Sequence, residues 1–184
     1  MKRHRSKNEL LAQMRELQRR KMTRFTAPFT GMAIISNFVL WKVEKFTQNK
    51  LEKYNQLVNE YYLKINNGDI SLDSLADRLF QKAEFKIEFE PYTEDDILVS
   101  RKDKYAYAWN KQNIEINNAI NDSCREYLII CFNALMDMGY GKKRLGRVRV
   151  NVLETLNSSG GKVMGMHQEL IDGVGIYIEK PIVN

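Results

Sequence analysis

The chain has 184 residues, of which 43% are hydrophobic and 10% aromatic, so it can form a packed core and is not a wholly disordered chain. Its net charge of +6 is unevenly placed, since residues 1–25 carry nine basic and two acidic side chains and the remainder sums to −1. A nearly neutral body with a basic arm indicates a polyanionic partner.

The apolar stretches are too short to cross a bilayer, and the basic N-terminus lacks the apolar core of a secretory signal. Cys124 and Cys131 lie seven residues apart in a predicted helix, too far apart for a mutual disulfide. Together with His4 and His167 they show none of the spacings of a zinc site. We therefore expect a cytoplasmic protein with two reduced thiols, no membrane contact, no metal and no cofactor.

The first half of the chain is predicted to be helical. Residues 6–24 have the apolar spacing of an amphipathic helix, with Ser6 and Glu9 as a capping box. After a break at Pro28 and Gly31, helices are predicted over 32–46 and 49–65. A turn at 66–69 is followed by a short helix with Ser71 or Asp73 near its N-cap.

The middle of the chain has the periodicity of strands. Apolar and charged residues alternate over 84–90, and residues 96–100 and 105–110 flank a turn, as in a β-hairpin. The aromatic residues of 105–110 would lie on one strand face, either packed or free to stack on bases. The acidic stretch 84–96 is either a solvated strand and loop or a mimic of nucleic-acid charge. Helical periodicity returns at 113–138.

The sequence contains an internal repeat. Residues 32–62 overlay 126–156 at an offset of 94, and after a three-residue shortening Leu79 meets Leu170 and Ile87 meets Ile178. Each copy reads as an apolar helix, a corner, a second helix, a Gly-containing turn, a short helix and a strand. The repeat predicts a helix over 142–157, although "RVRVNV" alone alternates like a strand.

We therefore expect an α+β fold that is mainly α, with two degenerate helical repeats joined by a small antiparallel β element. The predicted parts are a basic helical arm at 1–25, a first repeat with a terminal strand at 26–90, a β-hairpin connector at 91–111, and a second repeat with a terminal strand at 112–184. Exposed apolar edges of such repeats also allow a homodimer.

The stretch "GYGKKRLGRVRV" at 139–150 is the most basic segment outside the arm. It is not a Walker loop, but it places lysines beside the free N–H groups of a helix start, which attract anions. Cations at that helix end are unfavourable without a counter-charge. The corner is thus either an anion site or an ordinary turn, in which Tyr140 and Leu145 pack inward and the lysines are solvated.

Three segments carry a family resemblance: "ALMDMGYGKKRLGRV", "SSGGKV" and "ELIDGVGIYIE". They resemble small proteins of phages and mobile elements of Gram-positive bacteria, in which an apolar helix meets a Gly-aromatic-Gly-Lys-Lys-Arg-Leu corner. The likeness covers residues 125–180, while the first copy keeps Phe46, Lys50 and Leu51 and lacks the Gly-Lys-Lys core. The resemblance implies a bacterial host and a role against host defences, including inhibition of Cas nucleases.

The function predicted is a phage-derived binding protein that engages nucleic acid, or a nucleoprotein such as a Cas effector, and inhibits or regulates it. The alternative is an assembly module that binds only protein. No catalytic residues are identified, so an enzyme is not predicted. The candidate nucleic-acid or anion contacts are Arg3, Arg5, Arg15, Arg19, Arg20, Arg24, Gly141, Lys142, Lys143, Arg144 and Arg147.

Overall fold

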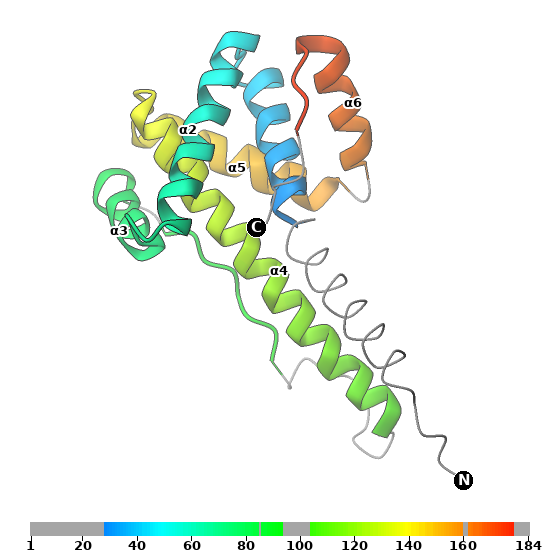
Figure 1. The fold of residues 1–184 in the computed structure, drawn as a ribbon. Coiled ribbons are helices and arrows are strands. Elements are labelled where there is room, and N and C mark those ends of the chain that lie inside the picture. Colours follow the sequence, from blue (N-terminus) through cyan, green and yellow to red (C-terminus); the bar gives the residue numbers. More distant parts are fainter. Residues whose placement is uncertain (1–27, 85, 94–103, 160–161, 179–184) are drawn as a thin grey trace, which may run out of the picture.

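A computed structural model describes residues 28–84, 86–93, 104–159 and 162–178 (Figure 1). The predicted basic arm, with its candidate arginines, and the stretch 96–100 lie outside the described residues. A first helix occupies residues 28–42. It is followed by α2 (Gln48–Asn66), α3 (Leu72–Ala83), α4 (Lys104–Asp137), α5 (Lys142–Ser158) and α6 (Val163–Val174).

The prediction of an α+β fold is wrong, because the described residues contain helices and no strand. Residues 86–93, within the predicted strand region, are extended but have no neighbouring strand. Their backbone is held along α4 instead: the Asn118 side chain bonds both the Tyr92 N–H (2.8 Å) and the Tyr92 carbonyl (2.9 Å). Ile87 is buried while Lys86 and Glu88 are exposed. The alternation of apolar and charged residues thus reflects a segment that packs one side against a helix. Such packing produces the same pattern as a strand without a sheet.

The predicted hairpin connector at 91–111 is also wrong where the structure describes it. Residues from Lys104 onward belong to α4, a continuous helix of 34 residues. Neither glycine nor proline interrupts it, so nothing in the backbone stops the helix before the 139 corner. The aromatic positions 105, 107 and 109 therefore lie on helical backbone and not on one face of a strand.

Where the structure describes the predicted terminal strand of the second repeat, residues 176–178 form no strand and follow the left-handed Gly175 (φ 67°). The Ile178 N–H donates to Nε2 of His167 (3.1 Å), and the His167 ring lies 5.2 Å from the Tyr177 ring. The histidine therefore ties this segment to α6. As in residues 86–93, a helix supplies the hydrogen bond that a sheet would have supplied.

Several helix predictions are confirmed. Ser71 caps α3 by accepting the Ser74 N–H (3.1 Å), and α2 covers the predicted 49–65. The stretch "RVRVNV" lies in α5, where Val148 and Val152 are buried and Val150 is 53% exposed. A strand would have placed all three valines on one face. Gly31, predicted to break the helix, instead lies within the helix at 28–42.

The helix bounds agree with the register of the internal repeat. At an offset of 94, the first residue of α2 meets the first residue of α5, and Lys45 (φ 59°) meets Gly139 (φ 85°). At an offset of 91, α3 and α6 coincide over their full 12 residues, and both end at a left-handed residue, Glu84 (φ 57°) or Gly175 (φ 67°). The common origin of the two copies remains a prediction.

Each short helix packs on the first helix of the other copy. In one direction α3 contacts α4, where Asn133 donates to the Leu75 carbonyl (3.0 Å). In the other, α6 lies beside the 28–42 helix (Figure 1), and a Cβ added to Gly173 would lie 2.4 Å from the Trp41 ring. This close approach requires glycine at 173. The two copies are therefore interlocked around one core.

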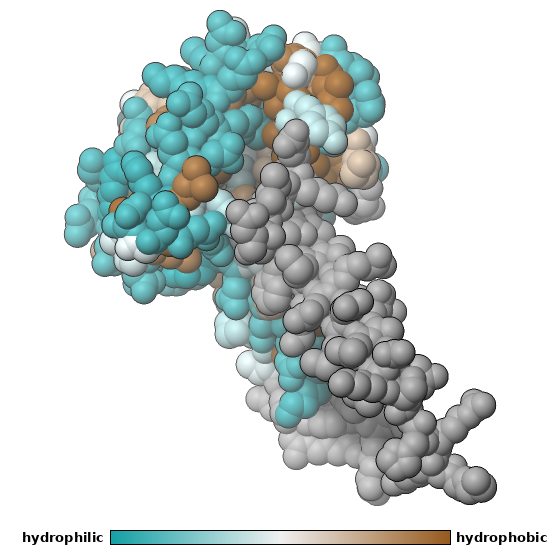
Figure 2. Space-filling model, in the orientation of Figure 1, coloured by the Kyte–Doolittle hydropathy of each residue, from teal (hydrophilic) through white to brown (hydrophobic). Residues whose placement is uncertain are grey.

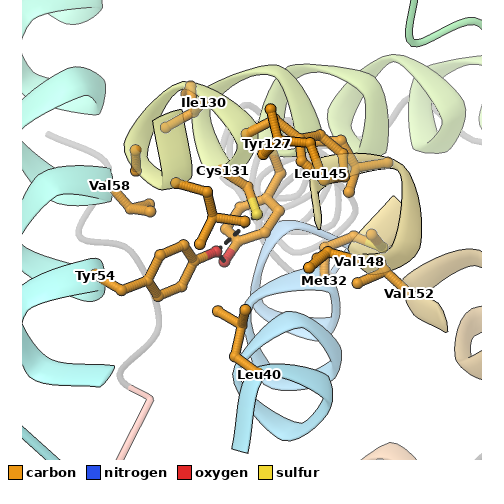
Figure 3. Packing of buried hydrophobic residues seen from close by; sticks show 14 of the residues in the cluster. Met32, Leu40, Tyr54, Val58, Tyr127, Ile130, Cys131, Leu145, Val148 and Val152 are labelled. Atoms are coloured by element: carbon orange, nitrogen blue, oxygen red, sulfur yellow. Dashed lines mark hydrogen bonds between the residues drawn. The ribbon is translucent and has the colours of Figure 1, made fainter. Parts of the chain in front are cut away.

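A small polar cluster lies inside that core (Figure 3). The Tyr54 hydroxyl donates to Sγ of Cys131 (2.8 Å) and lies 3.1 Å from the Tyr127 hydroxyl. Both cysteines are buried and free, as predicted, and burial raises the pKa of the Cys131 thiol to about 12. These hydrogen bonds join α2 of the first copy to α4 of the second, and they fix the register between the helices.

Val148→Ala and Val150→Ala test the helical register of α5. Truncating the buried Val148 is expected to lower the free energy of unfolding by about 2 kcal/mol, whereas truncating the exposed Val150 changes it by less than about 0.5 kcal/mol. Urea denaturation measures both. Equal costs for the two substitutions would contradict the helix.

Candidate anion-binding corner

The corner at 138–141 joins α4 to α5 by a tight reversal. Gly139 has a positive φ of 85°, a conformation that favours glycine, and its N–H donates to the Met136 carbonyl (2.9 Å). Gly141 is the N-cap of α5 in extended conformation, and its carbonyl accepts the N–H groups of Arg144 and Leu145 (3.0 Å each). No side chain caps this helix start.

Part of the corner is an ordinary packed turn, one of the two readings left open by the sequence. Tyr140 and Leu145 are buried, while Lys142 and Lys143 are exposed. Lys142 is not without a counter-charge, because its ammonium group pairs with the carboxylate of Glu84 at the end of α3. Lys143 makes no ion pair with a described residue.

Arg147 forms a bidentate pair with Glu44, which lies in the corner of the first copy. Nε donates to Oε1 (2.7 Å) and a terminal nitrogen to Oε2 (2.8 Å), while the Glu44 side chain is only 1% exposed. The hydrogen bonds from Arg147 hold the pKa of the Glu44 carboxyl below its ordinary value. Arg147 therefore links the two corners, and its role in this structure is to compensate a buried carboxylate.

The two corners also meet through an aromatic pair. The rings of Phe46 and Tyr140 lie 5.8 Å apart, tilted by 69°. Arg144 stacks over the Tyr140 ring at 4.3 Å, and Lys50 lies over the Phe46 ring at 5.9 Å. Lys50 is the equivalent of Arg144 at the repeat offset of 94. An exposed cation thus stands on each side of one aromatic pair.

Comparisons of the chain with protein-family models, with curated proteins and with solved structures give no match. The site is therefore interpreted from its own residues.

The structure brings some of the predicted site residues together in one corner, but only some of them remain without an ion pair to a described residue. Gly141, Lys142, Lys143, Arg144 and Arg147 all lie in one corner, but Lys142 and Arg147 are paired with acids of the first copy. The predicted contacts at Arg3, Arg5, Arg15, Arg19, Arg20 and Arg24 lie outside the described residues. In the described part of the chain, no group of three or more potential metal-binding side chains occurs, and no helix could span a membrane.

Sequence reasoning missed a second polar cluster, centred on Arg78. Its guanidinium donates to Asp137 (2.5 Å), to the Tyr61 hydroxyl (2.6 Å) and to Asn133 (3.2 Å). The cluster joins α2, α3 and the end of α4. The one sequence signal was Asn133, a polar residue within the apolar run "YLIICFNALM". We interpret the cluster as a structural connection, because all its charges are compensated within it.

Glu44→Gln tests the link between the corners through its pH dependence. The folded-state pKa of Glu44 is depressed, so its stabilising effect is present above the ordinary value of 4.5 and is lost as the pH falls through the folded value. The variant is expected to have a lower Tm than wild type at pH 7, and the difference should shrink below pH 4.5.

Glu60→Gln is the matched control, because Glu60 is an exposed carboxylate of α2 without a basic partner among the described residues. It should leave the Tm unchanged at both pH values. A Glu44→Gln difference that stayed constant with pH would contradict the assigned role of the carboxylate.

Proposed function

We propose that this protein is a binding protein, and not an enzyme, that engages nucleic acid or a nucleoprotein through the exposed cations of its corners. The observation that supports this is the position of Arg144, which stacks on Tyr140 and makes no ion pair with a described residue. Stacking orients the guanidinium and leaves its N–H groups free for a phosphate, which it can bind in a bidentate manner.

The neighbouring charge supports a phosphate ligand. Lys143 precedes Arg144 and is exposed, and Lys50 and Lys53 are exposed on α2 of the first copy. Arg147 compensates Glu44, and with the exposed Glu52 of α2 included these cations still leave a net positive charge at the corners. Arg3, Arg5 and the other basic residues of the arm would add phosphate contacts, with an affinity governed by counterion release.

The resemblance to phage and mobile-element proteins suggests the target class. The target would be a nucleoprotein of host defence, and the most specific proposal is a Cas effector. Such a complex presents both phosphates and a basic channel. Inhibition would follow if the protein occupied the nucleic-acid path. A pull-down from host lysate with and without nuclease treatment identifies the target, and capture that survives nuclease points to a protein surface.

A protein-only assembly role is the second candidate, and apolar surface near α6 favours it. Met164 is 72% exposed and Tyr177 is 66% exposed, and Figure 2 shows hydrophobic residues gathered over this part of the molecule. Exposed apolar groups of this kind are typical of protein contacts. Measuring the molar mass in solution distinguishes a homodimer built on this surface from a monomer.

A salt titration of binding tests the leading proposal. Wild-type protein is expected to bind DNA or RNA with an affinity that falls linearly with salt on logarithmic axes. The double variant Lys143→Ala/Arg144→Ala should bind more weakly, with a slope reduced by about two phosphate contacts.

The control variant Lys64→Ala/Lys162→Ala removes the same charge from the last turn of α2 and from the N-cap of α6. It should preserve the slope. If wild-type protein binds neither DNA nor RNA at low salt, direct nucleic-acid recognition is wrong. If both double variants lose the same affinity for nucleic acid, the corner is not the binding site.

A further inference from the structure

The arrangement of the two corners points to a ligand with twofold symmetry. We propose that the corners bind double-stranded nucleic acid, with Lys50 and Arg144 contacting phosphates on the two strands. This inference rests on the proposed function and deepens it by naming the form of the nucleic acid.

The first step is that the copies are related by an approximate twofold axis. Under such an axis, a residue that contacts its own equivalent must lie on the axis. Phe46 and Tyr140 are equivalents at the offset of 94, and their rings are in contact at 5.8 Å. The axis therefore passes through this aromatic pair.

Two contacts away from the axis have counterparts in the other copy, as twofold symmetry predicts. Glu84 of the first copy pairs with Lys142 of the second. Exchanging the copies predicts a contact between Gln48 and Gly175, and a Cβ added to Gly175 would lie 3.6 Å from Nε2 of Gln48.

A second matching pair has its charges reversed. Arg78 of α3 pairs with Asp137 at the end of α4 (2.5 Å). In the other copy Glu169, the equivalent of Arg78, pairs with Lys42 (3.1 Å), which lies one residue before Val43, the equivalent of Asp137. The same position on each short helix is thus used to hold the first helix of the opposite copy. Two independent contacts agree with the axis placed through the aromatic pair.

The cations are then placed symmetrically. Lys50 and Arg144 are equivalents, each lies over its own ring of the axial pair, and both are exposed. A duplex has local twofold axes perpendicular to its length, which relate phosphates on its two strands, and symmetric proteins bind it about such axes. A single strand has no such symmetry, so it does not present two symmetry-related phosphates to the two cations.

The chemistry of the two positions predicts a backbone contact. One copy has a lysine and the other an arginine, so the shared property is positive charge and not a pattern of hydrogen-bond donors. Phosphate contacts position a protein without reading sequence. We therefore expect recognition of duplex shape and charge with little dependence on base sequence.

The test compares Lys50→Ala, Arg144→Ala and the control Lys64→Ala in the full chain. Fluorescence anisotropy measures their affinity for a short DNA duplex, for an RNA duplex of the same sequence and for the corresponding single strands. Wild type should prefer at least one duplex over its single strand. Each corner variant should lose about fivefold in affinity for that duplex and about one unit of salt slope, while Lys64→Ala binds as wild type.

Conservative variants separate charge from folding. Lys50→Arg should retain duplex binding, and Arg144→Lys should retain most of the binding that Arg144→Ala loses, because either cation can contact a phosphate although lysine gives up the bidentate contact. Equal affinity for single strand and duplex, or an unaffected Lys50→Ala variant, would overturn the twofold mode while leaving the proposed function standing. Absence of all nucleic-acid binding would instead overturn the proposed function itself.

Discussion

The contact between the two corners is the interaction on which the rest of the fold depends. Phe46 and Tyr140 meet where the chain reverses between its first and second helices in each copy, and Arg147 closes the contact by compensating the buried Glu44 carboxylate. An uncompensated charge at that position would be costly. Once the corners are joined, α2 and α5 each begin two residues after the aromatic pair, and α3 and α6 can reach the first helix of the opposite copy.

The same contact determines which cations remain available to a ligand. Of the basic residues at the second corner, Arg147 and Lys142 are used to hold the first copy, whereas Arg144 and Lys143 are left at the surface. The first copy lacks the Gly-Lys-Lys core, but this loss does not remove its candidate phosphate contact. Lys50 retains the position equivalent to Arg144, so both halves keep an exposed cation beside the axial aromatic pair.

The helices were largely predictable and the β elements were wrong, for a common reason. Helical periodicity reports which face of a segment is buried, and the buried residues of α2 and α5 follow it. Alternation over a few residues does not by itself define a strand, since "RVRVNV" alternates within α5. Residues 86–93 and 176–178 form no strand, and side chains of α4 and α6 bond their backbone where a sheet was expected. The repeat was the most informative pattern, because it assigned "RVRVNV" to a helix against its own alternation.

The sequence by itself determined the bounds of α2 and α5 to within a residue and the set of basic residues that could meet an anion, whereas the 28–42 helix and α4 begin earlier than it predicted. These follow from local periodicity, turn chemistry and composition. Only the tertiary structure decided which cations are compensated, because Glu44 and Glu84 lie 103 and 58 residues from their partners. It also decided that the two corners face each other. Pairing between distant residues depends on how the copies interlock, and no local pattern in the chain records that geometry.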